Sequence, residues 1–93
     1  MTEDRTVRRA EGVLWRNVGP EVVATATDRE GFEVLSPSAG AAWRKLDRPR
    51  VPEDLVASLA EEYGLDPAAI RSDVQELLGD LVDRGLVELD AEI

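Results

Sequence analysis

Carboxylates are the most frequent side chains in this chain of 93 residues that could bind a metal ion or transfer a proton. Four of them recur at i, i+3, i+7 and i+10, which places them on one helix face: Asp73, Glu76, Asp80 and Asp83. Oxygen ligands for a divalent cation normally converge from several elements, often around a glycine-turned loop. This segment resembles no such loop, so we interpret the four acids as a solvated helix face and expect no metal site.

Nucleophilic catalysis finds little support, because the chain has neither His nor Cys. Their absence removes the usual zinc and haem ligands, disulfides and every nucleophile–base pair that needs either residue. Ser36, Ser38, Ser58 and Ser72 have no basic partner in the pattern, and Lys45 is the only lysine. No glycine-rich phosphate loop occurs. We therefore expect a protein that is not an enzyme and takes no cofactor.

Charge also restricts the partners. Twenty acidic against eleven basic residues give a net charge of −9, which repels a phosphate backbone. The only basic cluster (Arg44, Lys45, Arg48 and Arg50) is interpreted as a solvated connection. No run approaches the ~18 apolar residues of a membrane span, and no signal peptide is visible. We expect a cytoplasmic protein with no nucleic-acid or membrane partner.

The elements that position these side chains begin with strands. Short β-rich runs at 13–17, 21–27 and 32–35, with turn residues between them, predict a three-stranded antiparallel β-meander. In the last run, Phe32 and Val34 share one face, and Glu33 and Leu35 share the other. Residues 1–11 are expected to form a partly ordered N-terminal arm, in which a strand could begin near Val7, and residues 12–90 form the domain.

Helical periodicity follows, with helices predicted over 37–46, 52–63 and 67–84. A proline opens each helix, and Asp66 is a good cap for the third. Residues 86–89 either form a short terminal strand or pack against the core. The predicted fold class is α+β: a winged helix-turn-helix-like domain in which a three-stranded antiparallel β-meander is followed by three α-helices.

A peptide groove is one use of this arrangement. The apolar stripe of the third helix covers an arc of about 140°, which is wide for one buried seam. It consists of Ile70, Val74, Leu77, Leu78, Leu81 and Val82. If strand 31–35 lies at the sheet edge, its backbone groups are unpaired. An extended peptide could then add as another strand beside the apolar helix face. The sequence equally allows the N-terminal arm or a neighbouring copy to cover this edge.

Four segments occur in an order and spacing that resemble a known family: 34–43 (VLSPSAGAAW), 51–56 (VPEDLV), 63–64 (YG) and 73–87 (DVQELLGDLVDRGLV). From Val13 to Leu89 the chain resembles PqqD and the related recognition elements of peptide-modifying pathways. It has Leu35-Ser36 where the family has Leu-Asn, and Val51 where the family has Thr. Coenzyme, lasso-peptide and other modified-peptide pathways are therefore all left open.

The resemblance implies a non-catalytic adaptor that binds the leader segment of a ribosomally made precursor peptide. The adaptor would present the leader to a modifying enzyme: a radical S-adenosylmethionine enzyme, a cyclase or a leader peptidase. In the family the leader adds to the third strand and lies against the third helix. Carried over, this implies peptide-binding residues on the strand and on the helix: Phe32, Glu33, Val34, Leu35, Ile70, Arg71, Asp73, Val74 and Leu77.

Two alternatives share the predicted fold. A winged-helix nucleic-acid-binding protein needs a basic third helix, whereas this one carries two arginines against four acids, a net charge of −2. A structural self-association domain would pair the same edge strand with its own copy and form a homodimer.

Overall fold

The structure, a computed structural model, describes residues 6–26 and 30–90. Its main sheet is antiparallel, in the order β2 (Leu14–Val18), β3 (Glu21–Thr25) and β4 (Glu33–Leu35). This confirms the predicted meander and α+β fold class. The turn residues expected between the second and third strands, 28–31, lie partly outside the described residues.

Three helices follow, as predicted: α1 (Pro37–Lys45), α2 (Pro52–Tyr63) and α3 (Pro67–Asp83). The Ser36 hydroxyl accepts a hydrogen bond from the Ala39 amide at 3.3 Å and so caps α1. The Asp66 carboxylate caps α3 in the same way, through the Ala68 amide at 3.0 Å. Helix α2 ends at Gly64, whose φ of +67° is one that glycine adopts without strain.

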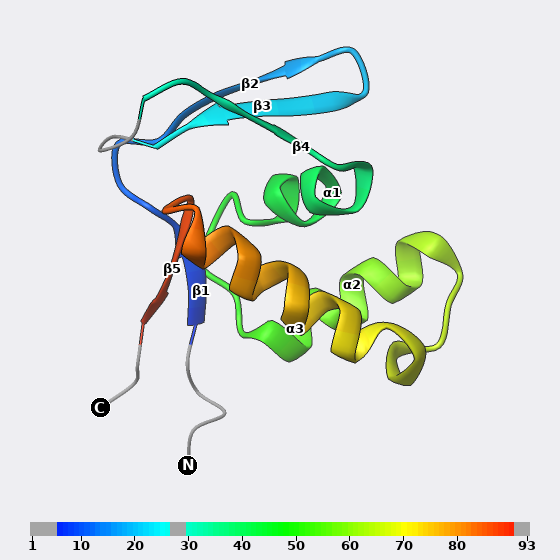
Figure 1. The fold of residues 1–93 in the computed structure, drawn as a ribbon. Coiled ribbons are helices and arrows are strands. Elements are labelled where there is room, and N and C mark those ends of the chain that lie inside the picture. Colours follow the sequence, from blue (N-terminus) through cyan, green and yellow to red (C-terminus); the bar gives the residue numbers. More distant parts are fainter. Residues whose placement is uncertain (1–5, 27–29, 91–93) are drawn as a thin grey trace.

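The core lies between the sheet and the helices. Figure 1 shows the three strands as one layer, α1 directly beneath them, and α2 and α3 below α1. Trp43 of α1 is fully buried in this core with Val22 and Leu35 from the sheet. Helix α1 approaches closely at Gly40, where a Cβ atom would lie only 3.3 Å from Val22 Cγ2.

A second, two-stranded sheet joins the ends of the chain. Strand β1 (Thr6–Arg9) pairs antiparallel with β5 (Val87–Asp90), and Val7 is fully buried. Val7 also exchanges backbone hydrogen bonds with Arg50, at 2.7 and 3.0 Å. Part of the expected N-terminal arm is therefore a strand of the domain. A four-residue strand with one buried side chain has no local signal for so distant a partner, which explains why the sequence predicted a largely solvated arm.

Arg9 connects this small sheet to the core. Its guanidinium lies 4.6 Å from the ring centre of Trp15 and 4.9 Å from that of Trp43. It also donates a hydrogen bond of 2.7 Å to the Trp43 carbonyl. Burial lowers the pKa of Arg9, and the charge of Asp47 opposes that change. The contact fixes β1 against β2 and α1.

Candidate functional site

The direction of the backbone groups in β4 follows from the register of the sheet. A two-residue loop closes on the Val18–Glu21 pair, and such a closing pair is hydrogen-bonded. Hydrogen-bonded and non-hydrogen-bonded pairs alternate along an antiparallel ladder. Alternate residues of β3, Val22 and Ala24, therefore direct their N–H and C=O groups away from β2 and toward β4.

Val34 is consequently the β4 residue whose N–H and C=O point to the open edge. Its neighbours Leu35 and Glu33 pair with β3 and use their backbone groups there. Among the described residues nothing pairs with the other side of β4, and the described part of the N-terminal arm pairs with β5 instead. β4 is thus an edge strand, and of the two possibilities that the sequence allowed, an open or a covered edge, the described residues show the open one.

A hollow of about 340 Å³ lies beside this edge. Its walls come from the start of β3, from β4, from the start of α1 and from the C-terminal end of α3 with its cap residue: Glu21, Val34, Leu35, Ser36, Ala39, Asp80, Leu81 and Arg84. The Arg84 guanidinium donates to the Glu33 carboxylate at 3.0 Å and lies 3.1 Å from the Asp80 carboxylate. Arg84 thereby joins α3 to β4 and closes this part of the hollow.

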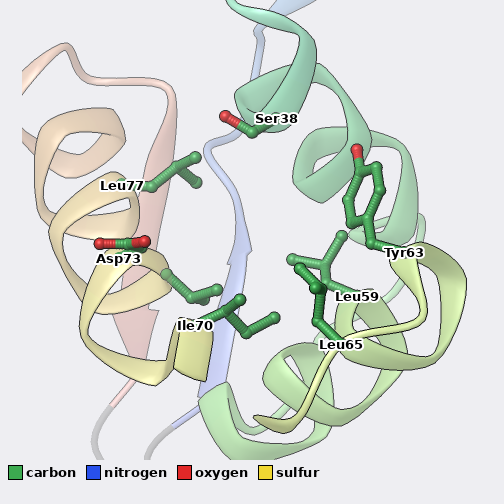
Figure 2. A pocket seen from close by; sticks show the side chains of 8 residues that line it. Ser38, Leu59, Tyr63, Leu65, Ile70, Asp73 and Leu77 are labelled. Atoms are coloured by element: carbon green, nitrogen blue, oxygen red, sulfur yellow. The ribbon is translucent and has the colours of Figure 1, made fainter. Parts of the chain in front are cut away.

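A second hollow, of about 220 Å³, lies between the N-terminal half of α3, the C-terminal end of α2 and the start of α1. Figure 2 shows Ile70 and Leu77 of α3 facing Leu59 and Leu65 across it, with Tyr63 beside them. Its lining is mostly apolar, with a serine and a carboxylate added: Ser38, Leu59, Tyr63, Leu65, Ile70, Asp73, Val74 and Leu77. Such a lining fits an apolar side chain of a ligand.

The two hollows are neighbours. Leu77 in the apolar hollow precedes Leu81 beside β4 by four residues, about 6 Å along the helix. Residues 36–39, at the start of α1, contribute to both. We call the two hollows together the β4–α3 groove. It begins at an open strand edge and continues onto an apolar surface, which is the form of site that binds an extended peptide.

The structure divides the residues implied by the resemblance. Ile70, Asp73, Val74 and Leu77 line the apolar hollow. Val34 and Leu35 line the hollow beside β4, where Glu33 binds Arg84. The α3 residues opposite β4 come from the C-terminal part of the helix, because that end of α3 lies near β4, where Arg84 binds Glu33.

Phe32 and Arg71 do not line the groove. Phe32 precedes β4 and is largely exposed on the other side of the sheet. Arg71 donates two hydrogen bonds to Glu53 of α2, at 2.7 and 2.8 Å. This pairing lowers the pKa of Glu53 and raises that of Arg71. The Glu53 carboxylate thus holds the Arg71 side chain against α2, and the assignment of Arg71 as a peptide-binding residue stays a prediction.

Several groove residues were missed by the sequence reasoning: Ser38, Leu59, Tyr63, Leu65, Asp80, Leu81 and Arg84. Leu81 belonged to the predicted apolar stripe, and the wide arc of that stripe could have suggested it. Tyr63 and Leu65 flank Gly64, where two large apolar residues beside a helix end offered a weak signal. Arg84 and Asp80 gave none, since charged residues near a helix end are common.

Three members of the basic cluster make contacts inside the domain. Arg44 donates to the Asn17 side chain at 2.9 Å, and Lys45 forms an ion pair with Glu62 at 2.8 Å. Arg50 donates to the Lys45 carbonyl at 2.6 Å. Within residues 6–26 and 30–90, no three metal-ligating side chains gather and no helix is long and apolar enough to cross a membrane. Nothing in this part of the chain favours nucleic-acid binding.

Comparison with known proteins decides the family. The model of "Coenzyme PQQ synthesis protein D (PqqD)" matches residues 21–87. The chain belongs to the PqqD family. The matched residues run from β3 to the start of β5 and include every residue that lines the β4–α3 groove. No curated protein matches the chain in sequence.

Solved structures share the PqqD-family fold. TbiB1 in complex with the TbiA(beta) leader peptide has a TM-score of 0.78 and 22% identity, covering 87% of this chain and 94% of TbiB1. The PqqD truncation of Methylobacterium extorquens PqqCD represents a functional, stand-alone recognition element for ribosomally synthesized and post-translationally modified peptides. It has a TM-score of 0.72 and 25% identity, covering 89% of this chain and 88% of that one.

Proposed function

We propose that this PqqD-family chain binds the leader segment of a ribosomally made precursor peptide and presents it to a modifying enzyme. The observation that carries the proposal is the open edge of β4 beside the β4–α3 groove. The complex of TbiB1 with a leader peptide shows that a protein of this fold takes such a ligand.

The leader would add to β4 as a fourth strand. Its backbone would exchange hydrogen bonds with Val34, and every second side chain would point inward over the hollow near Leu81. Beyond the end of β4 the peptide would cross the start of α1 at Ser38 and enter the apolar hollow. Asp80 and Asp73 are about 10 Å apart along α3, so about three extended residues separate the two hollows.

The proposed contacts are assigned by role. The leader would lie along the strand residues Phe32, Glu33, Val34 and Leu35. Val34 would offer it the backbone N–H and C=O, while Glu33 and Leu35 keep theirs on β3. Side-chain anchoring uses the apolar hollow, where the residues of α3 are Ile70, Asp73, Val74 and Leu77. Arg71 would act from outside the groove by holding α3 to α2.

The chain itself would be an adaptor without catalytic activity. It carries no His and no Cys, and its described part gathers no metal-ligating cluster. Covalent chemistry on the precursor would therefore belong to the partner: a radical S-adenosylmethionine enzyme, a cyclase or a leader peptidase. PqqCD supports this division, because there a PqqD segment joined to another part of the chain functions alone once separated.

An NMR titration tests the proposal. The labelled protein would receive the leader segment of the precursor encoded beside its gene, and a scrambled leader of the same composition would serve as the control. We expect amide shifts confined to residues 32–35 and to the residues lining the β4–α3 groove. Binding that leaves both regions unshifted, or no binding near 100 μM, where even weak complexes of about 5.5 kcal/mol form in part, would refute it.

A further inference from the structure

The far face of the main sheet is apolar and uncovered. Residues that alternate with the core-facing ones point to this side, and the largest are strongly exposed: Leu14 by 72%, Phe32 by 71%, Val18 by 50% and Val34 by 49%. In Figure 1 the helices lie on the opposite side of the sheet. We call these four residues, with Val23, the outer face.

The outer face also has a hollow and a positively charged side chain. A hollow of about 440 Å³ opens on it, with Leu14, Val23 and Phe32 in its lining. Arg16 lies at this hollow and pairs with Val23 in the sheet register. Within residues 6–26 and 30–90, the side chain of Arg16 makes no hydrogen bond or ion pair. A contiguous apolar patch with one unengaged cation is typical of an interaction site for a surface that carries a carboxylate.

A second copy of this chain fits the outer face poorly. The strands, of five, five and three residues, cover only about 210 Å², at ~3.4 Å per residue and ~4.8 Å per strand. A stable interface buries about 800 Å² on each partner. Each copy also carries a net charge of −9, which opposes self-association. The partner must therefore make contacts beyond this face.

The leader supplies those contacts. A strand added at β4 continues the sheet, and its outward side chains lie beside Val34 on the outer face. One surface then carries both the apolar patch and one side of the bound leader. An enzyme that acts on the precursor is brought close to the bound leader, so an enzyme docked here can bury both parts together.

We propose that the outer face is the docking surface for the peptide-modifying enzyme and that the bound leader completes it. This inference rests on the proposed function. Each ligand then strengthens binding of the other by the same factor, because coupling between two binding events is reciprocal. The enzyme would therefore bind the chain more tightly when the leader is bound to it than when it is not.

The test measures binding of the purified modifying enzyme encoded beside the precursor, by biolayer interferometry, with and without saturating leader peptide. Saturating leader should tighten enzyme binding at least about fivefold. Leu14→Asp and Arg16→Glu should weaken enzyme binding about tenfold or more, since each places a wrong charge in the interface. The control is Leu89→Asp, at an exposed leucine on β5 in the other sheet. This substitution should change the dissociation constant for the enzyme less than about twofold.

Leader binding by the same variants separates the possible failures. Leu14 and Arg16 lie on β2, away from the β4 edge, so both variants should bind the leader as the native chain does. If they do, yet bind the enzyme normally, the docking surface is wrong while the proposed function stands. A native chain that binds no leader would overturn both. A dimer in sedimentation that Leu14→Asp dissociates would show that a second copy occupies the face and would overturn the inference.

Discussion

Replacing Val34 by proline should abolish strand addition while preserving the fold. Proline removes the backbone N–H and places its ring where a paired strand would lie. In β4 this N–H points to the open edge, because Glu33 and Leu35 make the hydrogen bonds to β3. Proline is tolerated in edge strands at such positions. The Val34 side chain is half exposed, so its loss costs the core little.

The size of the effect follows from the hydrogen bonds. One lost N–H···O bond costs about 1 kcal/mol, and the leader carbonyl left without its donor costs about 1–3 kcal/mol more. Because the edge is open to water, which can bond that carbonyl, the lower end of the range applies, about 2 kcal/mol in total. The dissociation constant of the leader should therefore rise about 30-fold.

Fluorescence anisotropy with a labelled leader peptide measures this change. Val34→Ala is the matched control, since it shortens the same side chain but keeps the N–H, and it should bind within about threefold of the native chain. Circular dichroism and a thermal melt establish that both variants are folded. A folded Val34→Pro variant with the native dissociation constant would show that the leader does not pair with β4, and the reasoning from the sheet register would fail.

Three further predictions concern stability. Gly79→Ala should stabilise α3 by about 1 kcal/mol and raise Tm by about 4–8 °C, because a Cβ atom there meets open space; a lower Tm would refute it. Arg9→Ala should cost about 2 kcal/mol in urea unfolding, through the lost hydrogen bond to the Trp43 carbonyl and the lost ring contacts; an unchanged midpoint would contradict this. The Arg71 contact lowers the pKa of Glu53, so its stabilisation is present above the unfolded pKa of about 4.5 and disappears as the pH falls through the lower folded pKa. Glu53→Gln should therefore flatten the fall in stability on acidification, and an identical pH profile would argue against the pair.

Local features of the fold could be predicted from sequence because their causes are local. The two-residue loop before Glu21 and the turn residues around it predict a hairpin whatever the rest of the chain does. Ser36 and Asp66 cap helices through contacts within three residues. The edge position of β4 was also accessible, since the last strand of a short meander has only one neighbour.

The path of the groove could not be predicted, because it depends on how α3 crosses the sheet. Periodicity identifies the apolar side of α3 but not which turn of that side lies under β4. The crossing places Leu81 and Arg84 there, whereas Ile70 and Val74 lie farther away, against the end of α2. The pairing of β1 with β5 was inaccessible for a related reason, since its partners are separated by nearly the whole sequence.

An open β edge exposes a small protein to aggregation, because the edge can pair with the same edge of another copy. Here β4 is only three residues long, and the chain resumes as a helix at Pro37. Two copies joined edge to edge would gain few backbone hydrogen bonds and would bring together two chains of charge −9. A leader that also fills the apolar hollow gains more binding free energy than such a copy, because its side-chain contacts add to the short backbone pairing. The combination of a short β4 edge with a separate apolar hollow therefore favours binding of a peptide over pairing with a second copy.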